Sequence, residues 1–215
     1  MKIVPFIAFI VLMSSKSCGE EPFDAADGRR SFVSGSIVDD SGNGIANYDV
    51  KITSGNETLG LATTNANGSY EAAIIEPNRG ISFLRISPYS GNATYSSFSL
   101  NYSYERAQLS RSYQAIPVIL KGKSVVSLVF DNTTNTPFLA FARYTTIICD
   151  YHIREEIITN EDCNPVRSLM LSSTPDFPLQ VVTGTTVSIE IRRNNTSIFY
   201  DYLIDEATHE ILLTI

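Results

Sequence analysis

The stretch VSGSIVDDSGNGIANYDVKI, residues 33–52, holds two strand-like segments separated by a polar turn. In the second segment Tyr48, Val50 and Ile52 fall on one face, and polar side chains fall on the other. This period of two is typical of a half-buried antiparallel strand. The residues between the segments, 40–44, are types that tolerate positive φ or close Asx turns. The stretch therefore predicts two strands joined by a tight turn.

The same alternation continues along the rest of the chain. Residues 186–192 place Val187, Ile189 and Ile191 on one face. Further expected strands are residues 59–63, 69–75, 81–87, 113–120, 124–130, 138–148, 197–204 and 210–215. Short strands that recur about every 8–12 residues, with turn residues between them, favour sandwiches. We expect an all-β protein of two tandem β-sandwich domains. A helical turn is compatible with the sequence only at residues 105–112 and 152–159.

A second motif, TTNANGSY at residues 63–70, follows the stretch at residues 33–52. Together the two motifs resemble the carboxypeptidase regulatory-like domain, a transthyretin-like (prealbumin-like) Greek-key sandwich. The resemblance covers residues 32–120, and both turns and their flanking strands match the family pattern in order. It implies a module without catalytic residues that acts as a stalk, spacer or assembly domain.

The matched residues also have physical roles. Asp39, Gly42 and Gly44 are expected to build the turn between the first two strands. Gly68 supplies backbone freedom before the next strand, and Tyr70 is expected to point into the sandwich.

The N-terminus has the pattern of an export signal. Lys2 precedes the apolar run of residues 3–13, and small residues then lead to Cys18. The site resembles the lipobox of Bacteroidetes lipoproteins, in which the signal is cut before a Cys that receives lipid. We therefore expect residues 1–17 to be a lipoprotein signal peptide and Cys18 to carry a lipid that holds the protein in a membrane. The alternative is an ordinary cleaved signal with an incidental Cys18.

Composition shifts suggest how the remaining chain is divided. Residues 18–30 are polar and aperiodic, as expected of a tether. We expect a carboxypeptidase regulatory-like sandwich over residues 31–121 and a second β-sandwich domain over residues 122–215. In the alternative division, the strand at 124–130 closes the first domain and the boundary moves to about residue 132.

With Cys18 lipidated, Cys149 and Cys163 are left as an even pair in an exported chain. Disulfides persist in such compartments, so we expect these two residues to be bonded. The alternative is two unlinked thiols, with Cys149 in the core.

Composition argues against several kinds of chemistry. The 215-residue chain carries a net charge of −7, which does not suit nucleic acid. It has two His, His152 and His209, and neither lies in a complete zinc-binding motif. Asp39, Asp40 and Asn43 offer oxygen ligands but lack the spacing of a calcium loop. We expect no catalytic residues, no metal and no cofactor.

The segment at residues 87–113 is long for a sandwich loop and carries Tyr95, Tyr102 and Tyr104. Tyrosine offers an apolar ring and a hydroxyl, so these three are candidate ligand-binding residues. The alternative is a further strand whose aromatic residues belong to the core, because Phe98, Leu100 and Tyr102 fall at alternate positions.

These observations predict a non-catalytic, lipid-anchored protein of the outer membrane or cell surface. It would act as a scaffold, spacer or accessory module, with protein or glycan partners. The alternative is a surface glycan-binding lipoprotein of a polysaccharide-uptake system that uses the tyrosine-rich segment.

Overall fold

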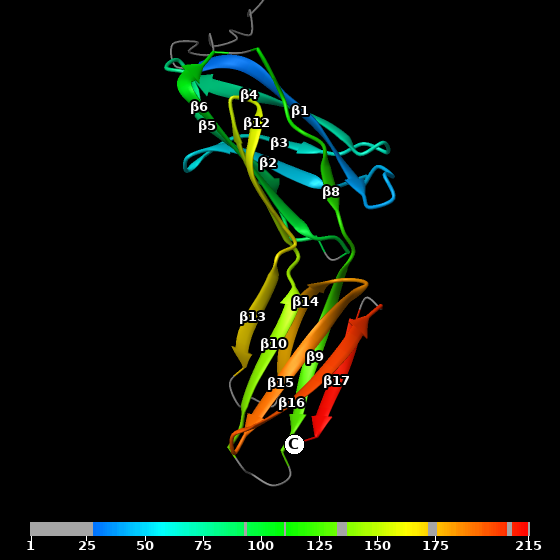
Figure 1. Ribbon diagram of the computed structural model, residues 1–215. Coiled ribbons are helices and arrows are strands. Elements are labelled where there is room, and N and C mark those ends of the chain that lie inside the picture. The colour runs from blue at the N-terminus through cyan, green and yellow to red at the C-terminus, as the bar shows by residue number, and fades with distance from the viewer. Residues whose placement is uncertain are drawn as a thin grey trace, which may run out of the picture.

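The computed structural model describes residues 28–92, 94–109, 111–132, 137–171, 176–205 and 208–214. Within these ranges the regular structure is β-strand, and Figure 1 shows the strands gathered into two sandwiches stacked end to end. The all-β sandwich prediction is confirmed. The expected signal peptide, most of the tether and Cys18 lie outside the described residues. In the described part of the chain, no helix has the length and hydropathy to cross a membrane.

The first domain is a sandwich of a four-stranded and a six-stranded sheet. Its N-terminal strands are β1 (Gly28–Asp39), β2 (Asp49–Ser54), β3 (Glu57–Thr63), β4 (Ser69–Pro77), β5 (Ile81–Pro88), β6 (Ser97–Gln108), β7 (Ser112–Gln114) and β8 (Val118–Leu120). In the smaller sheet, β1 pairs with β4, β7 and β8. The larger sheet has the order β12-β11-β6-β5-β2-β3. Alternate residues of both sheets, such as Ile37, Ile74 and Leu100, are buried between them.

Two strands of the larger sheet come from much later in the chain. They are β11 (Ile148–Arg154) and β12 (Ile157–Cys163), which form a hairpin. β11 lies parallel to β6, with Ile148 opposite Ser97 and Arg154 opposite Ser103. In Figure 1 the yellow hairpin rises from the lower domain into the upper one.

The expected division at residue 121 therefore needs correction, because residues 148–163 belong to the first domain. Cys149, Tyr151 and Ile153 are buried in its core. The alternation of apolar residues in this segment predicts a strand with one buried face. It does not indicate which of the two domains the strand joins. The segment at 152–159 is part of this hairpin and contains no helical turn.

The second domain is a smaller sandwich. Its strands are β9 (Lys123–Asp131), β10 (Leu139–Thr145), β13 (Val166–Leu171), β14 (Asp176–Val182), β15 (Thr185–Arg193), β16 (Thr196–Ile204) and β17 (Thr208–Thr214). One sheet has the order β13-β10-β15-β16, and the other has the order β14-β9-β17. Because β9 starts at Lys123 and lies wholly in this domain, the alternative boundary near residue 132 is wrong.

Within the described residues the chain passes between the domains three times, at residues 121–123, 145–148 and 163–166. Backbone hydrogen bonds tie these crossings together. Ser97 N donates to Ile147 O at 2.7 Å, Thr146 N donates to Pro165 O at 3.0 Å, and Thr183 N donates to Gly122 O at 2.9 Å. The expected disulfide between Cys149 and Cys163 is present and closes the hairpin beside these crossings.

Candidate functional site

The first motif folds into a tight turn after β1. The Asp39 carboxylate accepts hydrogen bonds from the backbone N–H groups of Ser41 and Asn43, at 2.9 and 2.8 Å, and from the Asn43 side chain. These hydrogen bonds, above all the one from the Asn43 side chain, lower the pKa of Asp39. The carboxylate oxygens therefore serve the turn, which explains why Asp suits this position.

The two motifs meet at a close crossing of backbone. A Cβ added at Gly44 would lie 2.1 Å from the Asn67 carbonyl carbon, and one added at Gly68 would lie 2.1 Å from Ile37 O. Gly68 also has a φ of +74°, which side chains disfavour. Glycine is thus required at both positions by contact, and at Gly68 by conformation as well. These residues build the fold of the first domain.

The three candidate tyrosines do not form one site. Tyr95 lies at the domain junction, where it bridges to Gly122. Tyr102 and Tyr104 lie along β6, roughly 17 and 23 Å from its first residue, Ser97, at the rise of a strand. The alternative interpretation, a strand whose aromatic residues belong to the core, is confirmed. The strand is β6, and its residues Phe98 and Tyr102 are buried.

Tyr102 and Tyr104 line a hollow of about 300 Å³ in the first sandwich, and Glu155 and Glu156 of the β11–β12 turn line it as well. Tyr102 is 5% exposed, and its hydroxyl accepts a hydrogen bond from Ile116 N at 2.9 Å. Tyr104 packs against the ring of Tyr113, with ring centroids 6.4 Å apart. Burial raises the pKa of both Tyr102 and Tyr104. The rings are largely committed to the core, so this hollow offers mainly polar groups.

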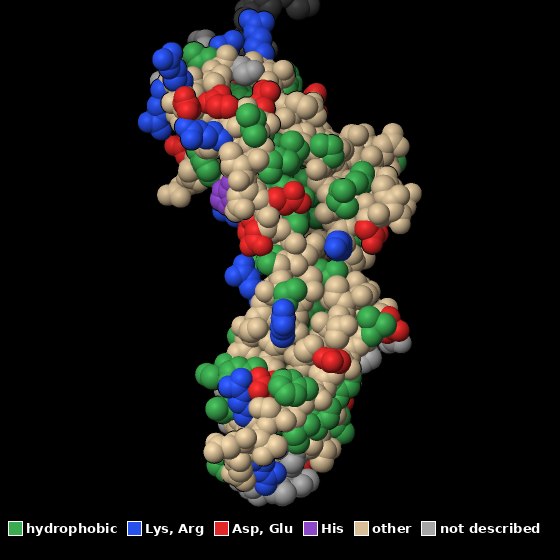
Figure 2. Space-filling model, viewed as in Figure 1, with side chains coloured by type: hydrophobic (Ala, Val, Ile, Leu, Met, Phe, Trp, Pro, Cys, Tyr) green, Lys and Arg blue, Asp and Glu red, His purple; other side chains and the backbone are tan. Residues whose placement is uncertain are grey.

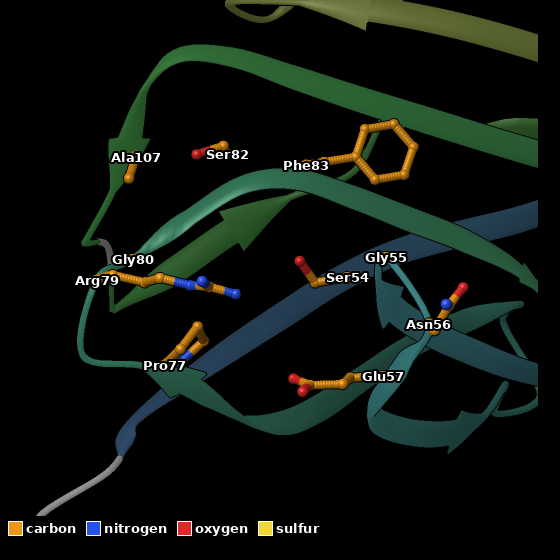
Figure 3. Close-up of a pocket in the computed structure, with 10 residues that line it drawn as sticks. All are labelled: Ser54, Gly55, Asn56, Glu57, Pro77, Arg79, Gly80, Ser82, Phe83 and Ala107. Carbon is orange, nitrogen blue, oxygen red and sulfur yellow. The ribbon is translucent and has the colours of Figure 1, made fainter.

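A larger hollow, of about 580 Å³, lies where the chain crosses from β4 to β5 (Figure 3). The β2–β3 turn contributes Asn56, and the first residue of β3 contributes Glu57. The β4–β5 turn contributes Arg79, and β5 contributes Phe83. Figure 3 shows the Arg79 side chain reaching toward Ser54, with the Phe83 ring on the far side of the hollow. Sequence reasoning missed this site, because its residues come from two turns and from the strands beside them, which carry no shared motif.

The charged side chains that line the two hollows are Glu57 and Arg79 in the larger one and Glu155 and Glu156 in the tyrosine-lined one. Among the described residues, no group of three or more His, Cys, Asp or Glu is placed to hold a metal ion. Glu155 and Glu156 are neighbours on the β11–β12 turn, and Glu155 accepts a hydrogen bond from Glu105 N at 2.6 Å. His152 is exposed on β11. Figure 2 shows acidic and basic side chains interspersed over the face in view.

No protein-family model matches the sequence. No curated protein matches it either. Three solved structures of bacterial proteins are similar over 86% of this chain: the Bacillus anthracis TIE protein, a streptococcal ancillary pilin and the shaft pilin SpaA of Lactobacillus rhamnosus GG. Their identities are 11%, 12% and 12%, and their TM-scores are 0.36, 0.32 and 0.33. The chain covers 33%, 62% and 98% of their lengths, so it spans less than two thirds of the first two.

Proposed function

We propose that this protein is a non-catalytic, lipid-anchored surface protein that acts as a stiff spacer or scaffold. The observation that carries the proposal is the junction between the domains. Two sandwiches joined by one linker would move independently, whereas here three chain crossings and their hydrogen bonds connect them. The β11–β12 hairpin is shared, because it leaves the second domain and completes a sheet of the first.

Stiffness is tested by a distance measurement between the domains. In protein carrying Cys18→Ala, spin labels are placed at Leu61 and Phe199, which are exposed residues of the first and second domain. Double electron–electron resonance is expected to give one narrow distance distribution. A broad or multimodal distribution with the disulfide intact would contradict the spacer.

Anchoring is proposed on Cys18 and the export signal. Cells that express the wild type in the presence of labelled palmitate should incorporate the label into this protein, and Cys18→Ala should abolish both the label and membrane association. Cys163→Ala serves as the matched control, because it removes a cysteine assigned to the disulfide and should leave the label in place. A freely secreted, unlabelled wild type would refute the anchor.

We also propose that the first domain is a carboxypeptidase regulatory-like module. Its support is that both motif turns are built by the matched residues, with Asp39 holding one turn and Gly44 and Gly68 packed against the other chain segment. Such a module fits a spacer role. Glycan binding by Tyr95, Tyr102 and Tyr104 as a single site has no support from their separate positions.

A further inference from the structure

We propose that the hollow formed by Phe83, Arg79, Asn56 and Glu57 binds a neutral sugar residue of a glycan. This goes beyond the spacer role and does not depend on it. An exposed aromatic ring, an irregular stretch of backbone and polar side chains that have no partner among the described residues meet at this place.

The aromatic platform exists because of a β-bulge. The pairing of β5 with β6 shifts register between Ile81 and Phe83. Ile81 and Leu84 are both buried, so the two residues between them, Ser82 and Phe83, both turn toward solvent. Phe83 is 40% exposed as a result. Bulges commonly re-aim side chains next to binding sites, and here the bulge presents a large ring to a hollow.

The polar groups around the ring are uncommitted. Arg79, Asn56 and Glu57 make no side-chain hydrogen bond or ion pair with any other part of the chain that the structure describes. In the same domain Arg154 and Glu105, by contrast, form an ion pair with each other. The hollow therefore brings together a guanidinium and an amide that donate and a carboxylate that accepts.

Two positive-φ glycines shape the turns that carry these groups. Gly55, with φ of +57°, forms the β2–β3 turn before Asn56, and Gly80, with φ of +81°, follows Arg79. A Cβ at Gly80 would lie 2.7 Å from Gln108 O, so this turn is packed closely against the end of β6. The side chains thus project from turns with defined conformations.

A sugar ring matches this combination. It has an apolar face of C–H groups that packs on an aromatic ring, and its hydroxyls both donate and accept hydrogen bonds. One cationic and one anionic side chain line the hollow, so its charge is balanced and favours a neutral sugar over an acidic one. The volume of about 580 Å³ lies in the range of small-ligand sites, roughly 300–1,000 Å³. In the tyrosine-lined hollow, Tyr102 and Tyr113 are 5% and 8% exposed, and the half-buried ring of Tyr104 packs against Tyr113.

Affinity gel electrophoresis of the full chain carrying Cys18→Ala tests the proposal. The gels contain amylopectin, yeast mannan, galactomannan or laminarin as neutral probes, and polygalacturonate as an acidic probe. Retardation by at least one neutral polysaccharide is expected. Phe83→Ala should weaken it about tenfold, because a ring contact is lost, and Phe83→Tyr should preserve it. Arg79→Ala should weaken it about fivefold or more, and Arg79→Gln, which keeps a donor, should weaken it less.

Matched controls are Phe199→Ala and Arg143→Ala, which change an exposed aromatic and an exposed basic residue of the second domain. Both should bind like the parent. The proposal is overturned if no neutral gel retards the parent, if only polygalacturonate does, or if Phe83→Ala and Arg79→Ala bind as well as the controls. These outcomes leave the spacer test unaffected, since that test measures a distance between domains.

Discussion

The two domains differ in what completes them. In the second domain β10 and β13 are antiparallel neighbours, with Thr145 opposite Val166, so its sheet is continuous without the hairpin between them. In the first domain the hairpin supplies two of six strands in the larger sheet and three buried side chains. The second domain therefore has a continuous sheet without the hairpin. The first domain depends on the β11–β12 hairpin, which the chain forms only after it has entered the second domain. A boundary drawn at a single position would cut the dependent domain.

The largest effect is expected when the hairpin is removed. Replacing residues 147–164 by a short Gly-containing turn should unfold the first domain, because β6 loses its parallel partner and the core loses Tyr151 and Ile153. The second domain should stay folded, since Thr146 and Pro165 already lie within hydrogen-bonding distance. Amide hydrogen exchange on peptides of β1–β6 and of β15–β16 would report each domain separately. Protection retained in both would show that the hairpin is dispensable.

The complementary fragment sharpens the same point. Residues 28–121 alone should not unfold cooperatively, whereas the same fragment with residues 147–163 appended through a short flexible linker should. A short linker is enough because the two ends that it joins are close together. Lys121 O accepts a hydrogen bond from Ser96 N at 2.8 Å, and Ile147 O accepts one from the next residue, Ser97 N, at 2.7 Å. Equal urea unfolding transitions for the two fragments would refute the dependence.

Where the two motif turns cross closely, the addition of a single methyl group should lower the stability of the first domain. Gly68→Ala combines a positive φ with a Cβ only 2.1 Å from Ile37 O, and we expect a loss of about 3 kcal/mol or more in the free energy of unfolding. Gly42→Ala is the control. It has a φ of +83° but no atom within 4 Å of the added Cβ, so it should cost only about 1 kcal/mol. Urea denaturation gives both values, and equal losses would mean that the close crossing contributes nothing.

The disulfide should matter to one domain only. Cys149→Ala together with Cys163→Ala removes a cross-link over a sequence separation of 14, for which loop entropy gives about 3 kcal/mol. We expect a loss of about 2–3 kcal/mol in the first domain, because the bond closes a hairpin of that domain. The transition of the second domain, followed by hydrogen exchange on β15 and β16, should not move. A shift confined to the second domain would contradict this assignment.

Alkaline pH should weaken the first domain by a smaller and gradual amount. Burial raises the pKa of Tyr48 to about 12, and it also raises the pKa values of Tyr70 and Tyr102. The unfolded chain releases these protons near pH 10, so the stabilisation is complete below about pH 10 and is lost as pH rises toward 12. Urea midpoints between pH 9 and pH 11.5 should fall, while tyrosinate absorbance develops late in the folded protein. A flat midpoint over this range would contradict the prediction.

The sequence by itself determined the local features of this protein. Alternation of apolar residues fixed the all-β class, because a strand must place successive side chains on opposite faces. The turn chemistry at Asp39 and Gly68 was readable, since hydrogen bonding by Asp and positive φ at Gly are local properties. The pairing of Cys149 with Cys163 was expected because these two cysteines remain once Cys18 is assigned to lipid in a chain predicted to be exported.

Only the tertiary structure decided which strands are neighbours. The alternation of apolar residues indicates which face of Ile148–Arg154 is buried. The partner of that strand, Ser97–Ser103, lies about fifty residues earlier, and nothing in the sequence near residue 148 identifies it. The hollow around Phe83 was hidden for the same reason, because a bulge and two turns distant in sequence converge there. Likewise, Tyr95 and Tyr104 are close in sequence, yet the extended backbone of β6 holds them apart.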